Sequence, residues 1–214
     1  ESASGYSSGQ AMKVLEEIAA EKLPPNIGIE WSGLSYQEKK QSGQTGIVIL
    51  LAFLFVFLFL AAQYESWSVP IAVLMSLPAA CIGAFIGIGI FGLENNVYFQ
   101  IGIVMLIGMA AKNAILIVEF AKEQVEKGVD VVEAAVIAGT MRFRPIVMTS
   151  LTFILGMLPL LWASGPGSVS RQSIGVGIFS GMLVAMTIGI ILVPFFFVWI
   201  YKIKERVKSK RENK

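Results

Sequence analysis

The chain has 214 residues, of which 55% are hydrophobic and only 15% are charged. A soluble domain is usually about 45–50% apolar and about 25% charged, so this composition indicates an integral membrane protein. The chain contains no histidine and a single cysteine, Cys81. These counts exclude an imidazole-based zinc site, a Ser-His-Asp triad and a disulfide within the chain.

The first 43 residues are polar and differ from the rest. Apolar residues at helical spacing predict an amphipathic helix over Gln10–Lys22, and an alternating pattern over Ile27–Trp31 predicts a short strand. One helix and one strand do not bury a core. We therefore expect residues 1–43 to be the end of a larger αβ domain, and we interpret the absence of an initiator Met or a signal pattern as a start inside a longer protein.

Five apolar segments follow, each near the ~20 residues that cross a bilayer. They cover residues 46–62, 70–91, 97–120, 146–163 and 174–201. The second and the fifth contain Gly83-x-x-x-Gly87 and Gly177-x-x-x-Gly181, spacings that let helices approach closely. Residues 130–139 predict a short amphipathic helix at the membrane interface. The sequence therefore predicts an all-α membrane fold with five transmembrane helices.

Basic residues predict the orientation of these helices. The tail, residues 204–214, is rich in Lys and Arg, which is typical of a cytoplasmic flank. Nucleic-acid binding is the alternative, although no folded basic surface accompanies the tail. The link between the third and fourth segments falls on the same side and is also basic, with Lys122, Lys127, Arg142 and Arg144. An odd number of spans then places residues 1–43 outside the cytoplasm.

A lysine lies near the middle of the third segment. Lys112 has apolar neighbours on both sides, and a charge at that depth costs roughly 3 kcal/mol on insertion scales. It should therefore face a partner or a water-filled path. No Asp or Glu lies in the central part of any of the five segments. Either the amine is neutral, since burial disfavours its charged form, or its carboxylate partner lies on another segment or chain.

Other polar residues in the spans are open to two interpretations each. Asn113 could form an interhelical hydrogen bond or line a water path. Glu119 shares a helix face with Lys112, but it lies near the cytoplasmic end and is also typical of an interfacial charge. Either hydroxyl of Thr149–Ser150 could bond to a carbonyl four residues earlier. Arg142 could be an anchor that reaches the interface.

Three stretches, Gln63–Pro70, Gly108–Lys122 and Arg142–Leu151, resemble the hydrophobe/amphiphile exporters of the resistance-nodulation-division superfamily. These are drug/proton antiporters of Gram-negative inner membranes, and the resemblance covers nearly the whole chain. It implies the end of a periplasmic porter subdomain, followed by helices eight to twelve of a twelve-helix transporter with two parallel repeats. It also implies a homotrimer, a periplasmic adaptor, an outer-membrane channel, amphiphilic drugs as cargo, and the proton-motive force in place of a cofactor.

The resemblance also implies roles for single residues. In the family, the lysine that matches Lys112 pairs with two aspartates on helix four, and the residues that match Thr149 and Arg142 join this proton relay. Asn113 is a weaker member. Helix four belongs to the first repeat, which this chain lacks, so the partner of Lys112 would come from there. Some relatives carry an acid at the position of Asn96, which puts a relay role there in doubt.

Three other functions fit parts of the sequence. An exporter of the same superfamily could carry metal ions or assist protein export. Six methionines are scattered over three helices, which is typical of core packing: Met105, Met109, Met148, Met157, Met182 and Met186. A small membrane enzyme would have only Lys112, Cys81 and hydroxyls to work with. The chain could also be an assembly-only half or an inert truncation. We expect a secondary active transporter with no metal site rather than an enzyme.

Overall fold

The computed structural model describes residues 8–24, 26–33, 35–36, 39, 45–64 and 66–212. Its elements in chain order are α1 (Ser8–Lys22), α3 (Thr45–Tyr64), α4 (Ser68–Phe91), α5 (Val97–Glu126), α6 (Val131–Leu161), α7 (Ser168–Val184), the π-helix η1 (Ala185–Gly189) and α8 (Ile190–Glu212). These described ranges contain no strand. The predicted all-α fold is confirmed.

Among the described residues, five stretches of helix are long and apolar enough to cross a membrane. They are Gly46–Tyr64, Val69–Phe91, Val97–Glu126, Val131–Leu161 and Ser168–Ile203, the last of which joins α7, η1 and α8. Helices suit this environment because each satisfies its backbone hydrogen bonds within itself, which lipid cannot do for it. The predicted number of transmembrane helices is therefore confirmed.

Two local expectations differ from the structure. Ile27–Trp31 is not a strand, which fits the need of a strand for neighbours to pair with. Instead of an interfacial helix over 130–139 and a separate span after Pro145, α6 runs unbroken from Val131 to Leu161. Membrane helices tolerate an internal proline because nearby groups and small local adjustments satisfy the freed carbonyl. Of the predicted segments, residues 1–7, 25, 34, 37–38, 40–43 and 213–214 lie outside the described residues.

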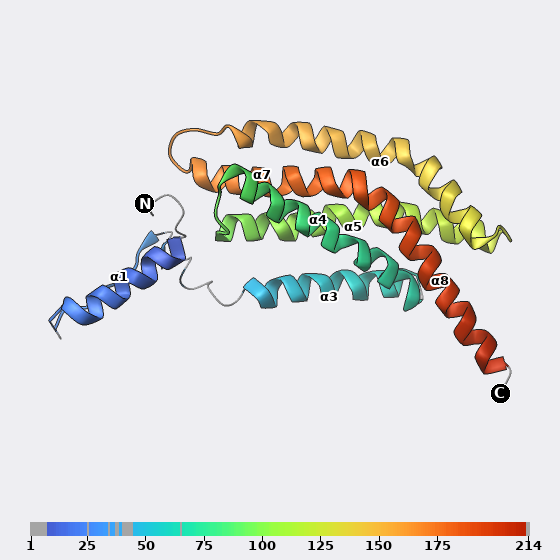
Figure 1. The fold of residues 1–214 in the computed structure, drawn as a ribbon, viewed down its shortest axis with the longest axis horizontal. Helices are drawn as coiled ribbons and strands as arrows, with labels where there is room; N and C mark the ends of the chain where they lie inside the picture. The colour runs from blue at the N-terminus through green and yellow to red at the C-terminus, as the bar shows by residue number, and fades with distance from the viewer. Residues whose placement is uncertain are drawn as a thin grey trace.

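The helices form a layered bundle (Figure 1). α4, α5 and α7 lie in the middle, α6 lies along one side, α3 along the other, and α8 continues from α7 beyond the end of the bundle. α7 packs against α4, α5 and α6. α3 buries Leu60 and Tyr64 near its end, whereas Phe55 and Phe59 are 67% and 68% exposed. α3 is thus attached along one edge and leaves much of its surface open.

Close contact between α4 and α7 depends on glycines. A Cβ added at Gly83 would lie 2.6 Å from Val184 Cβ, and one at Gly87 would lie 2.0 Å from Ser180 Oγ. No other residue leaves room for helix axes at this separation. The predicted close approach at both glycine pairs is confirmed, since a Cβ on α7 would meet α5 in the same way at Gly177 and Gly181.

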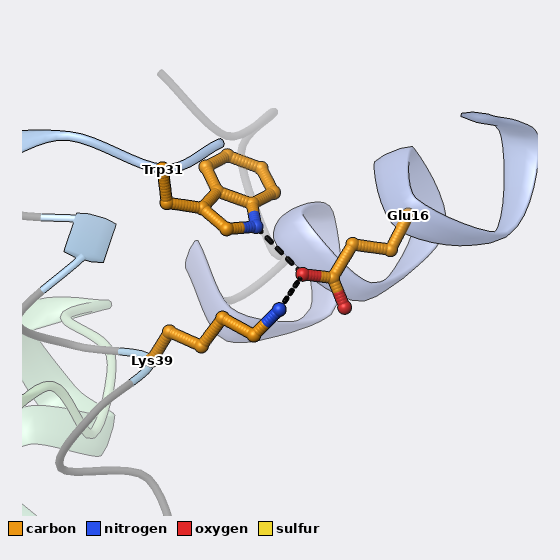
Figure 2. Close-up of polar contacts among 3 residues, drawn as sticks. All are labelled: Glu16, Trp31 and Lys39. Carbon is orange, nitrogen blue, oxygen red and sulfur yellow. Dashed lines mark hydrogen bonds and ion pairs between the residues drawn. The ribbon is translucent and has the colours of Figure 1, made fainter. Parts of the chain in front are cut away.

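A polar cluster ties α1 to the segment that follows it (Figure 2). The carboxylate of Glu16 accepts hydrogen bonds from Lys39 Nζ and from Trp31 Nε1, the latter at 2.6 Å. The bond from Lys39 and then the bond from Trp31 lower the pKa of Glu16 below its ordinary value. The ionised carboxylate is therefore the form that holds this segment together.

Gly83→Ala should destabilise the bundle by about 1–3 kcal/mol, because the added methyl group overpacks a rigid contact. The matched control is Gly89→Ala on the same helix, where a Cβ meets nothing within 4 Å. That control should be neutral or slightly stabilising, since alanine favours a helix over glycine. Thermal unfolding in detergent compares them, and equal melting temperatures for the two variants would show that the contact is not tight.

The hydrogen bonds to the Glu16 carboxylate should depend on pH. Because the pKa of Glu16 is lowered in the folded state, the ionised carboxylate contributes its full stabilisation above the unfolded-state pKa. That stabilisation is lost as pH falls through the folded-state pKa. The indole N–H resonance of Trp31, assigned with Trp31→Phe, should therefore move only at acidic pH, below the usual range of a glutamate. Glu16→Gln should remove this pH dependence, and an unchanged titration in that variant would contradict the assignment.

Candidate functional site

Lys112 lies halfway along α5, about 20 Å from each end at 1.5 Å per residue. Its side chain is exposed. Ile101, Met105 and Glu119 are exposed on the same stripe of the helix. The ammonium group therefore stands on an outer face of the bundle that is otherwise mostly apolar.

Carboxylates lie away from this position. Among the described residues, the ion pairs involve Lys39, Lys122 and Lys127, and none involves Lys112. The described acids of α5 near its end, Glu123 and Glu126, pair with Lys127 and Lys122. Within the described part of the chain, the mid-membrane charge has no counter-ion.

Asn113 points to the inner side of the same helix turn. It is 8% exposed, and its Nδ2 donates to Ser150 Oγ of α6 at 3.1 Å. Of the two interpretations of Asn113, the structure contains the interhelical hydrogen bond. Further along, Arg142 Cζ of α6 lies 4.9 Å from the centre of the Phe120 ring of α5. The two contacts together show that α5 and α6 run antiparallel.

The same geometry relates Lys112 to Thr149. Asn113 and Ser150 face each other, and the preceding residue on each helix is turned by about 100°. Because the helices are antiparallel, both turns lead to the same side of the pair. Thr149 is exposed there, and its hydroxyl donates to the carbonyl of Ile146 at 3.1 Å. The structure thus places Lys112 and Thr149 on one open face at one depth.

Arg142 lies further along this face. It precedes Thr149 by seven residues, which is about 10 Å along the helix. Its guanidinium stacks over Phe120, a cation–π arrangement that is favourable where water is scarce. Its Nε is buried and has no hydrogen-bond partner among the described residues. The structure does not bring Arg142 into contact with Lys112.

A model of the AcrB/AcrD/AcrF family matches residues 1–201. The chain belongs to this family. It is 54% identical to the toluene efflux pump membrane transporter TtgB of Pseudomonas putida over 196 residues, 92% of this chain and 19% of TtgB. It is 48% identical to the multidrug export protein AcrF of Escherichia coli over 199 residues, 92% of this chain and 19% of AcrF.

A third relative, the multidrug resistance protein MdtF of Escherichia coli, is 46% identical over 210 residues, 98% of this chain and 20% of MdtF. The chain therefore spans about a fifth of the length of these curated relatives. The predicted membership of the resistance-nodulation-division superfamily is confirmed.

Asn96 makes two hydrogen bonds that hold the start of α5 in this AcrB/AcrD/AcrF family member. Its Oδ1 accepts from the amide of Phe99 at 2.9 Å and so caps the start of α5. Its Nδ2 donates to Ser173 Oγ of α7 at 2.7 Å. Asn96 therefore fixes the start of α5 to α7. The contact of α5 with Arg142 lies near the other end of the helix.

Sequence reasoning missed two buried hydroxyls. A bond from Ser150 back along its own helix is one possibility that the sequence offers, and in the structure Ser150 Oγ accepts the hydrogen bond from Asn113. Ser76 of α4 is 6% exposed and donates to the carbonyl of Val73 at 2.7 Å. The partners of such buried serines depend on the relative register of neighbouring helices. The sequence of one apolar helix does not indicate that register. The described residues include no group of three acidic or cysteine side chains that could hold a metal ion.

Ser150→Ala should lower the free energy of unfolding by on the order of 1 kcal/mol, the scale of an interhelical hydrogen bond in a membrane. Asn113 would then keep a buried amide without its partner. Thr152→Ala is the control, because this exposed hydroxyl bonds only to its own helix at Met148. Unfolding in mixed detergent measures both, and an equal loss in the two variants would argue against the pairing.

Proposed function

We propose that the chain is the C-terminal part of a proton-driven efflux transporter for amphiphilic drugs. Family membership supports this, as do the names of its relatives, which describe export of toluene and of multiple drugs. The observation that carries the proposal is Lys112: a charge at mid-membrane depth, on an open face, with no carboxylate partner among the described residues.

Lys112 is the cationic side of an ion pair whose acidic side lies on helix four of the first repeat. A lone ammonium group in the hydrocarbon region is costly, whereas a paired one is compensated by its partner. The exposed stripe of α5 is where that helix would pack. Thr149 offers a hydroxyl on the same face, and Asn113 holds the helix turn from behind through Ser150.

Proton coupling follows from the charges. Ionised aspartates attract Lys112, and protonation removes their charge and hence most of the attraction. The lysine is then released, and α5 shifts relative to the first repeat. A proton that crosses the whole membrane contributes ~2.3 kcal/mol per 100 mV. Arg142, further along the same face, lies towards the cytoplasmic end of this path and completes the relay.

The proposal includes a location and an assembly. The protein is a multi-pass protein of a Gram-negative inner membrane, with the N-terminal segment in the periplasm and the basic tail in the cytoplasm, as the positive-inside rule predicts. Residues 1–43 are part of a porter subdomain that the membrane helices move. The working unit is a homotrimer that docks a periplasmic adaptor and an outer-membrane channel.

Lys112→Ala in the full-length transporter should abolish drug efflux without changing expression or trimer formation. Lys127→Ala is the matched control, because this lysine pairs with Glu123 at the exposed end of α5 and should retain nearly full transport. Efflux of a fluorescent amphiphile from energised cells measures both variants. Normal efflux in Lys112→Ala would rule out the relay assignment.

A further inference from the structure

A small, partly open cavity lies between α4, α5, η1 and α8, behind the helix turn that carries Lys112. It is bordered by Ser76 of α4, Asn113 and Ile117 of α5, Ala185 and Gly189 of η1, and Val193 of α8, among others. Its accessible space is about that of one water molecule. Lys112 itself is not part of the lining, so this is a different place from the open face described above.

The π-helix explains why there is space here. η1 interrupts an otherwise α-helical span, and the residues that it presents to the cavity are small. Pro194 follows closely in α8 and lacks the amide that would bond the carbonyl four residues earlier. A π-turn is one way in which a membrane helix accommodates such a proline. Short π-segments inside α-helices are often found at functional sites.

The lining contains hydrogen-bonding groups that are not fully used. Asn113 has two amide hydrogens and a carbonyl oxygen, and among the described residues its side chain makes one hydrogen bond, to Ser150. Ser76 uses its hydrogen for the carbonyl of Val73, which leaves its oxygen lone pairs as acceptors. Both residues are buried. Unused polar groups in a dry interior are costly, and a buried water typically serves two to four of them.

We propose that this cavity is a water-binding site. The water donates a hydrogen bond to Ser76 Oγ and forms another with the side-chain amide of Asn113. It thereby links α4 and α5 beside η1. Asn113 then holds Ser150 on one side and the water on the other. The turn of α5 that presents Lys112 outward is fixed inward by these two bonds.

A consequence for transport rests on the proposed function. If α5 moves when Lys112 is released, the link between α4 and α5 through the water can rearrange, because no direct hydrogen bond between their side chains has to break there. The binding of water itself does not rest on that function. An experiment that detects the water therefore separates the two.

X-ray radiolytic labelling of the full-length transporter in membranes tests the site, since hydroxyl radicals formed from a bound water oxidise the side chains next to it. Ile117 and Val193 line the cavity and are 1% and 3% exposed. Ile146 and Ile178 are fully buried away from it. The expected result is oxidation of the first pair several-fold above the second. Equal oxidation of the two pairs would overturn the proposal.

Gly189→Ala places a methyl group in the cavity, where the nearest atom outside its local backbone is Ala185 Cβ at 3.9 Å. It should reduce labelling of Ile117 and Val193 to the background without lowering the melting temperature. Persistent labelling in this variant would place the water elsewhere and overturn the proposal.

Ser76→Ala removes one partner of the water, and Ser180→Ala is its control. Both serines donate to a carbonyl of their own helix at 2.7 Å, and Ser180 does not line the cavity. Labelling should fall in the first variant and stay unchanged in the second. An equal effect of both would contradict a water at Ser76. Loss of efflux with normal labelling in any variant would concern the transport function alone.

Discussion

An ammonium group halfway through a membrane is the constraint on which the rest of this structure depends. Lys112 lies about 20 Å from each end of α5, well inside a helix that is long and apolar enough to cross a membrane. In the proposed function, a carboxylate partner packs on the face to which it points. The bundle keeps that face open, because its own packing lies on the other side, where glycines bring α4 and α7 into close contact.

α5 consequently has two polar sides at one level. Lys112 faces outward on the exposed stripe of the helix, and Asn113 faces inward, where it bonds to Ser150. The neutral side is suited to holding the helix in place, because a neutral amide costs less to bury than a charge. A charged side is suited to a switch, because its interaction with a carboxylate would change when that carboxylate is protonated. In the proposed function, Asn113 thus anchors the helix and the adjacent Lys112 couples it to protonation.

Much of this could be predicted from the sequence. The five spans follow from apolar runs of sufficient length, and Lys112 is conspicuous because it is the charge at the centre of one. The pairing of Asn113 with Ser150 could not be predicted, since it depends on the relative register of α5 and α6. The apolar side chains of the two helices do not specify that register. The unbroken course of α6 through Pro145 and the π-helix before Pro194 were missed for another reason. Proline breaks helices in water, but neighbouring groups in a membrane bundle compensate for it.

The central claim is that Lys112 is paired with a carboxylate of the first repeat, and a double-mutant cycle in the full-length transporter tests it most directly. Lys112→Met would be combined in turn with Asp→Asn at each aspartate in the middle of an N-terminal transmembrane helix, and thermal stability would be measured in detergent. The account predicts that each single variant of the true pair is destabilised and that the double variant recovers much of the loss, because both buried charges are then gone. Additive losses at every aspartate would contradict it.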